Sequence, residues 1–312
     1  MAGHLGEIIE KELAVVATWS KILEARAILL DAPEPDNAER YSELVRESEK
    51  APPYHLIPIL RYLAEVESAT GKSRDGIVVL DHGCGGGATL MYLAAMGYRQ
   101  VYGVDVDGDI YEADLALRAI TELTEPQLLI YDGLNLPFPA DMFDFIFSQQ
   151  VVEHVDDDCI GVFLDEEVRV LSGSGIVYHQ IPHRWTPWES HTKTWVIHYL
   201  PRQVRIRLYI LFGHDPEYVE KLLFLRTPLY YTQQFRARYP TISNKTLERL
   251  TLRPDAAYYD GNLKLRQLVS ASARLPVIRS ILSNLVMLDL TARKKSQNGS
   301  TDHTKLKGLQ GD

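Results

Sequence analysis

Residues 78–87 of the chain read VVLDHGCGGG, and this stretch decides the fold. The apolar run at 78–80 predicts a buried strand, the closely spaced glycines predict a tight turn, and the apolar residues from Ala88 onward predict a helix. A strand that passes through a glycine-rich turn into a helix is typical of the first unit of nucleotide-binding α/β folds. Because glycine has no Cβ, its backbone can approach a ligand closely.

Two kinds of ligand fit this turn. Gly83-x-Gly85-x-x-Ala88 matches the dinucleotide pattern, with Asp105 close to the distance expected of a ribose-binding acid, and this favours an NAD(P)-dependent oxidoreductase. Asp81 argues for a different ligand, because a carboxylate two residues before the first glycine suits a cationic group better than a pyrophosphate. The pattern D-x-G-C-G-x-G after an apolar strand resembles the first motif of class I methyltransferases, which bind S-adenosylmethionine, a ligand with a sulfonium and an amino group.

Further segments follow in the order that this resemblance requires. They are VYGVD at 101–105, LLIYDG at 128–133, FDFIFS followed by QQVVEHV at 143–155, and RVLSGSG followed by a fifth strand at 169–181. The set resembles the type 11 (ubiquinone/menaquinone-biosynthesis-like) methyltransferase family over roughly residues 76–182. The resemblance implies an S-adenosylmethionine-dependent methyltransferase with a doubly wound, mostly parallel, seven-stranded Rossmann-like α/β sheet. A non-catalytic protein that binds S-adenosylmethionine is a further alternative.

The chain divides into five expected parts. They are an N-terminal helical cap at 1–75, the cofactor-binding core at 76–182, a helical and aromatic insertion after strand five at 183–242, the end of the core at 243–293, and a tail at 294–312. The end of the core would supply a sixth strand at 245–252 and a seventh strand at 284–292. The tail is polar and rich in Gly, Ser and Lys, so we expect it to be disordered. Within these parts we expect helices at 5–30, 38–50 and 55–69 in the cap, at 202–212 and 217–225 in the insertion, and at 263–282 before the seventh strand. The insertion would lie on the acceptor side.

Composition limits the class of protein. The net charge of −9 over 312 residues argues against a general nucleic-acid binder. Cys84 and Cys159 have no C-x-x-C partner, so neither a disulfide framework nor a cysteine zinc site is expected, and a reducing cytoplasm is the simplest compartment. Charged residues interrupt the N-terminal segment, so it is not expected to be a signal peptide, and no apolar run reaches the ~18 residues of a transmembrane helix.

The resemblance implies a set of residues that contact the cofactor. They are Asp81, Gly83, Gly85, Gly87, Asp105, Val106, Asp132, Gly133 and Gln150. Asp81 would reach the methionine amino group through water, and Asp105 would accept hydrogen bonds from both ribose hydroxyls, because a carboxylate has two oxygens. Asp132 and Gly133 would hold adenine. Alternatively, Asp81 caps the following helix and Asp132 is an ordinary turn acid, since Asp-Gly is a common turn dipeptide.

Catalytic residues are less sharply indicated, because methyl transfer needs mainly alignment and needs a base only if the acceptor must lose a proton. His154, after strand four, is one candidate, and its alternative role is packing on the sheet. Glu189 and His191 are the others, from the aromatic and histidine-rich stretch HQIPHRWTPWESH at 179–191. Three histidines and a glutamate of this stretch offer a zinc site as an alternative, but the H-E-x-x-H spacing of helical zinc sites is missing, so no metal site is expected.

The insertion is basic within an acidic protein. Its arginines are Arg202, Arg205, Arg207, Arg226, Arg236 and Arg238. They would form a solvated helix face, a cradle for an anionic acceptor, or a peripheral membrane contact. We therefore expect a small-molecule or a lipid- or sugar-linked acceptor and no nucleic acid, and the sequence indicates no particular oligomeric state.

Overall fold

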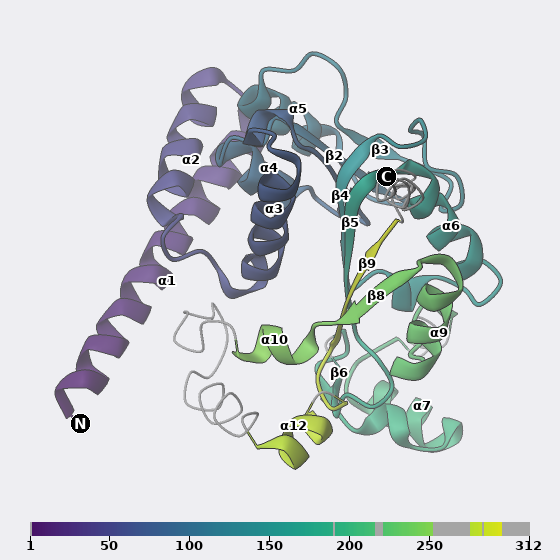
Figure 1. Ribbon diagram of the computed structural model, residues 1–312. Coiled ribbons are helices and arrows are strands. Elements are labelled where there is room, and N and C mark those ends of the chain that lie inside the picture. The colour runs from purple at the N-terminus through teal and green to yellow at the C-terminus, as the bar shows by residue number, and fades with distance from the viewer. Residues whose placement is uncertain (1, 190, 216–220, 252–274, 283, 295–312) are drawn as a thin grey trace, which may run out of the picture.

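The computed structural model describes residues 2–189, 191–215, 221–251, 275–282 and 284–294 (Figure 1). Seven strands form one sheet in the order β3-β2-β1-β4-β5-β9-β8. They are β1 (Val78–His82), β2 (Gln100–Asp105), β3 (Leu128–Ile130), β4 (Phe143–Gln149), β5 (Leu171–Ile181), β8 (Thr241–Asn244) and β9 (Leu288–Arg293). The pairs among β1 to β5 are parallel, and β9 runs antiparallel to both β5 and β8. The predicted seven-stranded, mostly parallel sheet is confirmed.

The strand order places a ligand site at one edge of the sheet. From β1 the chain first builds β2 and β3 on one side and then crosses to β4 on the other. Leu80 is paired with Tyr102 of β2 and with Ile146 of β4, so the three strands end close together. Ligands of open α/β sheets bind beyond the carboxyl ends of the strands at this kind of reversal.

Helices cover both faces of the sheet (Figure 1). On one side are α1 (Ala2–Asp31), α2 (Pro35–Ser48), α3 (Ile57–Thr70), α4 (Ala88–Ala95) and α5 (Tyr111–Thr121); on the other are α6 (Ile160–Val170) and α9 (Pro228–Arg238). Alternate residues of β4 belong to two different hydrophobic cores. Phe145 and Phe147 pack under the first group of helices, and Ile146 packs under the second. Burial on both faces is the pattern of a parallel sheet between helices. In the part of the chain that the structure describes, none of the helices combines the length and the hydropathy of a membrane span.

The three N-terminal helices are present where the sequence predicted them, with boundaries shifted by a few residues. The second helix was expected from Ala38, but α2 begins at Pro35. Proline is tolerated at the first helical position, because the N–H that it lacks would have no helical partner there. Helices α1 and α2 contact each other, and α2 contacts α4 and α5, so the N-terminal segment is packed onto the helices of the core.

The insertion after β5 is not purely helical. Strands β6 (Trp188–Glu189) and β7 (Thr194–Trp195) form a separate antiparallel pair, followed by a 3-10 turn, η4 (Ile197–Tyr199), and by α7 (Arg202–Leu211). The helix predicted at 202–212 is confirmed. A helix predicted at 217–225 lies partly outside the described residues, and the chain at 223–225 has no helical structure, so that part of the prediction is wrong.

The sixth strand was predicted in the wrong place. The segment 245–252 was expected to be a strand, but β8 ends at Asn244 and α10 (Thr246–Thr251) follows. The Asn244 side chain accepts a hydrogen bond from the Thr246 backbone N–H at 3.0 Å, which starts the helix. The seventh strand is confirmed as β9, which begins four residues later than predicted and ends one residue later. A helix predicted at 263–282 is described only as α12 (Pro276–Leu282). The predicted disordered tail lies outside the described residues apart from Lys294.

Candidate active site

The glycine turn after β1 combines two positions with different roles. Gly83, Gly85 and Gly87 have φ of 92°, 49° and 67°, which favour glycine. A Cβ on Gly83 would lie 2.3 Å from Cγ2 of Val151, so this glycine is required by packing against the segment after β4. A Cβ on Gly85 would have nothing within 4 Å. Gly85 is therefore the position of the turn that leaves room for a ligand.

Asp105 fixes this turn from the end of β2. One carboxylate oxygen accepts a hydrogen bond from the Gly85 N–H at 2.7 Å, and the other accepts from the Val106 N–H at 2.8 Å. The residue predicted to hold ribose thus also shapes the loop that would lie beside the ligand. A ribose contact at this carboxylate stays a prediction.

The two acids at this edge fit a cationic ligand. Asp81 is 5% exposed. Burial, and next the charge of Asp105, raise the pKa of Asp81 well above its usual range. Both effects would be offset by a positive group placed between the carboxylates. S-adenosylmethionine carries a sulfonium and an ammonium group, so the chemistry of this pair suits it, whereas a pyrophosphate would add to the repulsion.

The predicted adenine end lies beyond β2 and β3. Val106 is 58% exposed, and a Cβ on Gly133 (φ 79°) would lie 3.1 Å from Cγ1 of Val106. An exposed apolar side chain next to a glycine, which has no side chain, can pack against a flat ring such as adenine. Asp132 accepts hydrogen bonds from the N–H groups of Asn135 and Leu134 and from the Asn135 side chain, and these bonds lower the pKa of Asp132. The turn role is thus observed, and the adenine contact stays a prediction.

Gln150 lies where β4 ends. It is exposed, has a φ of 58°, and donates its backbone N–H to the Gln180 carbonyl oxygen of β5 at 2.9 Å. This bond fixes the chain as it enters the 3-10 turn η3 (Val152–His154). Since Val151 touches the Gly83 position, η3 is held against the glycine turn.

The structure brings the three catalytic candidates together. Nε2 of His154 lies 3.0 Å from Nε2 of His191, although the two residues are 37 positions apart. Nδ1 of His191 lies 2.8 Å from Oε1 of Glu189. The cluster therefore joins η3, which follows β4, to the β6–β7 segment of the insertion.

Glu189 orients its neighbours in this cluster. Its carboxylate accepts hydrogen bonds from the N–H and Nδ1–H of His191 and from the N–H and hydroxyl of Thr192. Burial alone would raise the pKa of Glu189, but these bonds, led by the one from the His191 ring, outweigh it and lower the pKa to about 2. A carboxylate with its lone pairs engaged in this way is better suited to positioning His191 than to accepting a proton. Its catalytic role stays a prediction.

Glu153 was missed by the sequence analysis. It is fully buried beside the two histidines, and Oε1 lies 3.5 Å from Nε2 of His191. Neither carboxylate oxygen has a hydrogen-bond partner in the part of the chain that the structure describes. Burial, with a smaller contribution from the charge of Glu189, raises the pKa of Glu153 well above its usual range. The available signal was the Glu-His pair after β4, where a charged residue directly follows Val151 and Val152.

A second polar cluster, between the sheet and α6, was also missed. Glu167 of α6 lies 2.8 Å from Nδ1 of His82 and 3.0 Å from Nε2 of His179, and Tyr131 lies 2.8 Å from Nε2 of His82. His179 was expected with the histidine-rich acceptor loop, but it belongs to β5 and is fully buried against Glu167. His183 donates from Nε2 to the Val286 carbonyl oxygen at 2.8 Å. Of the histidines at 179–191, His191 is the one that contacts His154.

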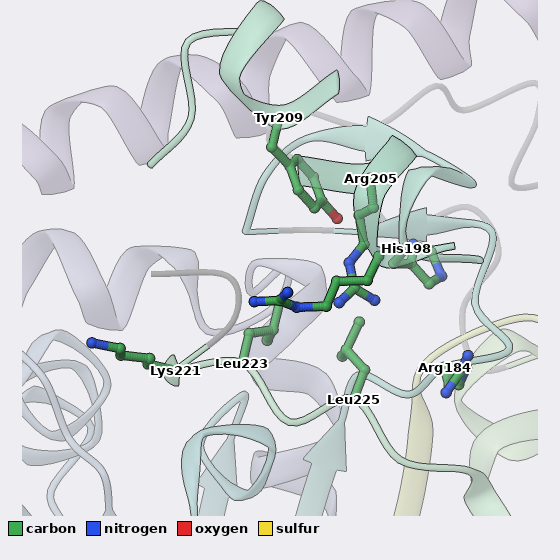
Figure 2. A pocket seen from close by; sticks show the side chains of 8 residues that line it. Arg184, His198, Arg205, Tyr209, Lys221, Leu223 and Leu225 are labelled. Atoms are coloured by element: carbon green, nitrogen blue, oxygen red, sulfur yellow. The ribbon is translucent and has the colours of Figure 1, made fainter. Parts of the chain in front are cut away.

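A basic cavity of about 450 Å³ adjoins the cluster (Figure 2). It is lined by Arg184, His198, Arg202, Arg205, Tyr209, Lys221, Leu223 and Leu225. Figure 2 shows the side chains of Tyr209 and Arg205 reaching towards the space beside Leu223 and Leu225. The segment with these leucines also carries the Leu222 carbonyl oxygen, which lies 2.5 Å from Nδ1 of His154, and the Phe224 N–H, which donates to the Glu153 carbonyl oxygen at 2.7 Å.

The arginines predicted for the insertion therefore divide into three groups. Arg202 and Arg205 line the cavity. Arg226 and Arg238 instead form ion pairs with Asp157 and Asp165, and Arg207 and Arg236 are exposed, as a solvated face predicts. Arg184 and Lys221 also line the cavity and were not singled out from the sequence.

Comparison with known proteins identifies the core. Residues 80–179 match the family model described as a methyltransferase domain. The chain is 29% identical over 168 residues to a ubiquinone biosynthesis O-methyltransferase of Chelativorans sp., covering 50% of this chain and 64% of that protein. It is 31% identical over 108 residues to the ajmaline N-methyltransferase of Rauvolfia serpentina, covering 34% and 36%. The chain thus spans less than two thirds of these curated relatives.

Solved structures show a weaker likeness. The geranyl diphosphate C-methyltransferase of Streptomyces coelicolor matches with a TM-score of 0.41 at 17% identity, over 74% of this chain and 77% of that one. The family match agrees with the resemblance drawn from the sequence: residues 80–179, which hold β1 to β4 and most of β5, match a methyltransferase domain. The match argues against the NAD(P)-dependent oxidoreductase alternative.

Proposed function

We propose that this chain, whose residues 80–179 form a methyltransferase domain, transfers the methyl group of S-adenosylmethionine to an anionic acceptor bound in the basic cavity. The observation that carries the proposal is the contact between the two halves of the site. The glycine turn packs through Gly83 on Val151, and the cluster of Glu153 and His154 follows directly. A donor at the turn and an acceptor in the cavity would meet at η3.

On the donor side, the chain contributes shape and charge. Gly85 leaves open space, Asp81 and Asp105 would pair with the cationic groups of the donor, and Val106 with Gly133 offers a surface for its ring. The bound donor supplies a methyl group activated by its sulfonium. The protein must then align donor and acceptor, and alignment can supply most of the rate in an in-line displacement.

On the acceptor side, the cavity indicates the chemical class. Three arginines and a lysine line it together with Leu223 and Leu225, so we infer a small molecule, or a lipid- or sugar-linked one, that has a phosphate or carboxylate group next to an apolar part. The two curated relatives named above act, by their names, at oxygen and at nitrogen, so they support a small acceptor without selecting its atom. A cytoplasmic location is proposed from Cys84 and Cys159, which are both free. Membrane contact through the insertion stays a prediction.

Calorimetry and a labelled-methyl assay test this function. We expect S-adenosylhomocysteine to bind with a stoichiometry of one and NADH to give no heat. With methyl-labelled S-adenosylmethionine and a fractionated cell extract, label should pass to an acidic small molecule that an anion exchanger retains. Binding of NADH in place of S-adenosylhomocysteine would overturn the proposal. Binding of S-adenosylhomocysteine without label transfer to any fraction would instead support the non-catalytic alternative.

A further inference from the structure

The fold brings together three side chains of the types that bind metal ions. The ligand atoms of Glu153, His154 and His191 all lie within 4.8 Å of one another. Nε2 of His191 is 3.0 Å from Nε2 of His154 and 3.5 Å from Oε1 of Glu153. Two imidazoles and one carboxylate make a ligand set that suits zinc.

The hydrogen bonds of the two rings fix where their protons lie. Nδ1 of His154 faces the Leu222 carbonyl oxygen and Nδ1 of His191 faces the Glu189 carboxylate, and both partners can only accept. Each neutral ring therefore carries its proton on Nδ1 and its lone pair on Nε2. The two Nε2 lone pairs thus face the same small space. A cation shared between them would turn their repulsion into attraction.

Glu153 adds an independent observation. Its carboxylate is fully buried at this space, and neither oxygen has a hydrogen-bond partner among the residues that the structure describes. Burying a carboxylate is costly unless it is paired, hydrogen-bonded or bound to a metal. A divalent ion at the Nε2 atoms would satisfy this carboxylate as well.

We propose that Glu153, His154 and His191 bind one divalent transition-metal ion of the zinc class. Ligand atoms about 2.0–2.1 Å from zinc at tetrahedral angles lie ~3.3 Å apart, and the observed separations of 3.0 and 3.5 Å bracket this value. The Leu222 carbonyl and Glu189 hold the ring N–H groups, as outer partners of metal-bound histidines do. The sequence predicted no metal here, because the ligands come together only through the fold.

The site leaves room for a role in the reaction, and this step rests on the proposed function. Three protein ligands leave a fourth tetrahedral position, as in catalytic zinc sites. An acceptor hydroxyl bound there would lose its proton to water more easily. Its oxygen would form the bond to the methyl carbon, while the carbon–sulfur bond breaks and leaves its electron pair on sulfur. The acceptor would then be a hydroxyl compound that also carries the anionic group.

Metal analysis of the untagged full-length protein tests the site. After incubation with Zn²⁺ and desalting, we expect about one zinc per chain by elemental analysis. Glu153→Gln and His191→Gln should lose it, whereas His55→Ala, which removes an exposed histidine that packs on Trp19, should retain it. Co²⁺ should give the absorption of a four- or five-coordinate site in the wild type and in His55→Ala.

A variant that keeps all three ligands controls for the possibility that the ligand variants lose zinc because they misfold. Glu189→Gln should bind zinc roughly 10–100-fold more weakly in a chelator competition, because it loosens the outer hydrogen bond to His191. The site is overturned if the wild type holds no zinc, if His191→Gln holds as much as the wild type, or if Mg²⁺ binds in preference. S-adenosylhomocysteine binding separates the two proposals: binding without zinc overturns the site alone, and zinc without such binding overturns the proposed function.

Discussion

Asp105 and Gly85, twenty positions apart, are joined by a hydrogen bond of 2.7 Å from the Gly85 N–H to a carboxylate oxygen of Asp105. The bond ties the open position of the glycine turn to the end of β2, so one carboxylate both shapes the loop and faces the proposed ribose site. The positions predicted from separate motifs therefore act as one unit.

Replacing Asp105 should weaken cofactor binding. In Asp105→Ala the loop loses its anchor and the ribose hydroxyls lose their acceptor. Hydrogen bonds to a charged group contribute about 1.5–3 kcal/mol each, so affinity for S-adenosylhomocysteine should fall at least tenfold in calorimetry. Asp105→Asn, which keeps one acceptor oxygen, should lose less. A folded Asp105→Ala variant with wild-type affinity would remove Asp105 from the cofactor site.

Gly85→Val should prevent close approach of the cofactor, because the branched side chain would fill the open space beside the turn. It also forces valine into the left-handed region, at a cost of about 1–3 kcal/mol in stability. Gly71→Val is the matched control: Gly71 has a φ of 68°, and a Cβ there also meets nothing within 4 Å.

Both valine variants should therefore lose similar stability in urea unfolding, and only Gly85→Val should lose S-adenosylhomocysteine binding. Equal affinities in the two variants would mean that the turn serves the fold and leaves the ligand untouched.

Protonation of Glu167 should lower the free energy of unfolding of the protein at acid pH. Burial would raise its pKa, but the charge and hydrogen bond of His179, followed by those of His82, outweigh burial and lower the pKa to about 2. The folded-state pKa is thus below the unfolded value of about 4.3, so the stabilisation is present above pH ~4.3 and is lost as pH falls towards 2. At about 1.4 kcal/mol per pKa unit, the loss is on the order of 3 kcal/mol.

Urea unfolding of the wild type and of Glu167→Gln between pH 7 and pH 3 measures this contribution. The variant should be less stable at pH 7 and should lose less stability on acidification. Its neighbour Glu166, which is only partly buried and pairs with Arg169, provides the control Glu166→Gln with a smaller effect. Parallel pH curves for the wild type and Glu167→Gln would contradict this role of Glu167.

The sequence predicted the sheet because each of the first five strands carries its own local signal. Buried apolar runs, the glycine turn and the acids at strand ends are short-range features, and their order identifies the domain. β8 was misplaced because its four residues have no apolar run, and its pairing with β9 depends on a segment far along the chain.

The site was predicted less completely, for a related reason. His154 and His191 were singled out one by one, but their contact is made by the path of the insertion, which no local pattern encodes. In the sequence, Glu153 is only the residue before His154. Its burial and its distance to His191 in the structure show that its carboxylate belongs to the cluster. The sequence predicts that His179 lies with the histidine-rich loop, whereas its pairing in β5 places it beside Glu167.

The basic cavity should control acceptor affinity. Arg205 lines the cavity from α7, whereas Arg207 lies on the same helix and is exposed to solvent. Arg205→Gln should raise KM for the anionic acceptor roughly 10–100-fold, because a lost charged hydrogen bond is worth about 1.5–3 kcal/mol. The kcat should change little, since Arg205 would bind the acceptor at a distance from the reacting atoms and act on ground and transition states alike.

The comparison with Arg207→Gln separates a specific contact from the general charge of the helix. Both substitutions remove one positive charge from α7, so a long-range field would raise KM similarly in the two variants and would weaken with added salt. A contact in the cavity would raise KM in Arg205→Gln alone and would leave S-adenosylhomocysteine affinity unchanged, because the proposed cofactor site lies at the ends of β1 and β2. The anionic acceptor would be ruled out for this cavity if Arg205→Gln kept the wild-type KM.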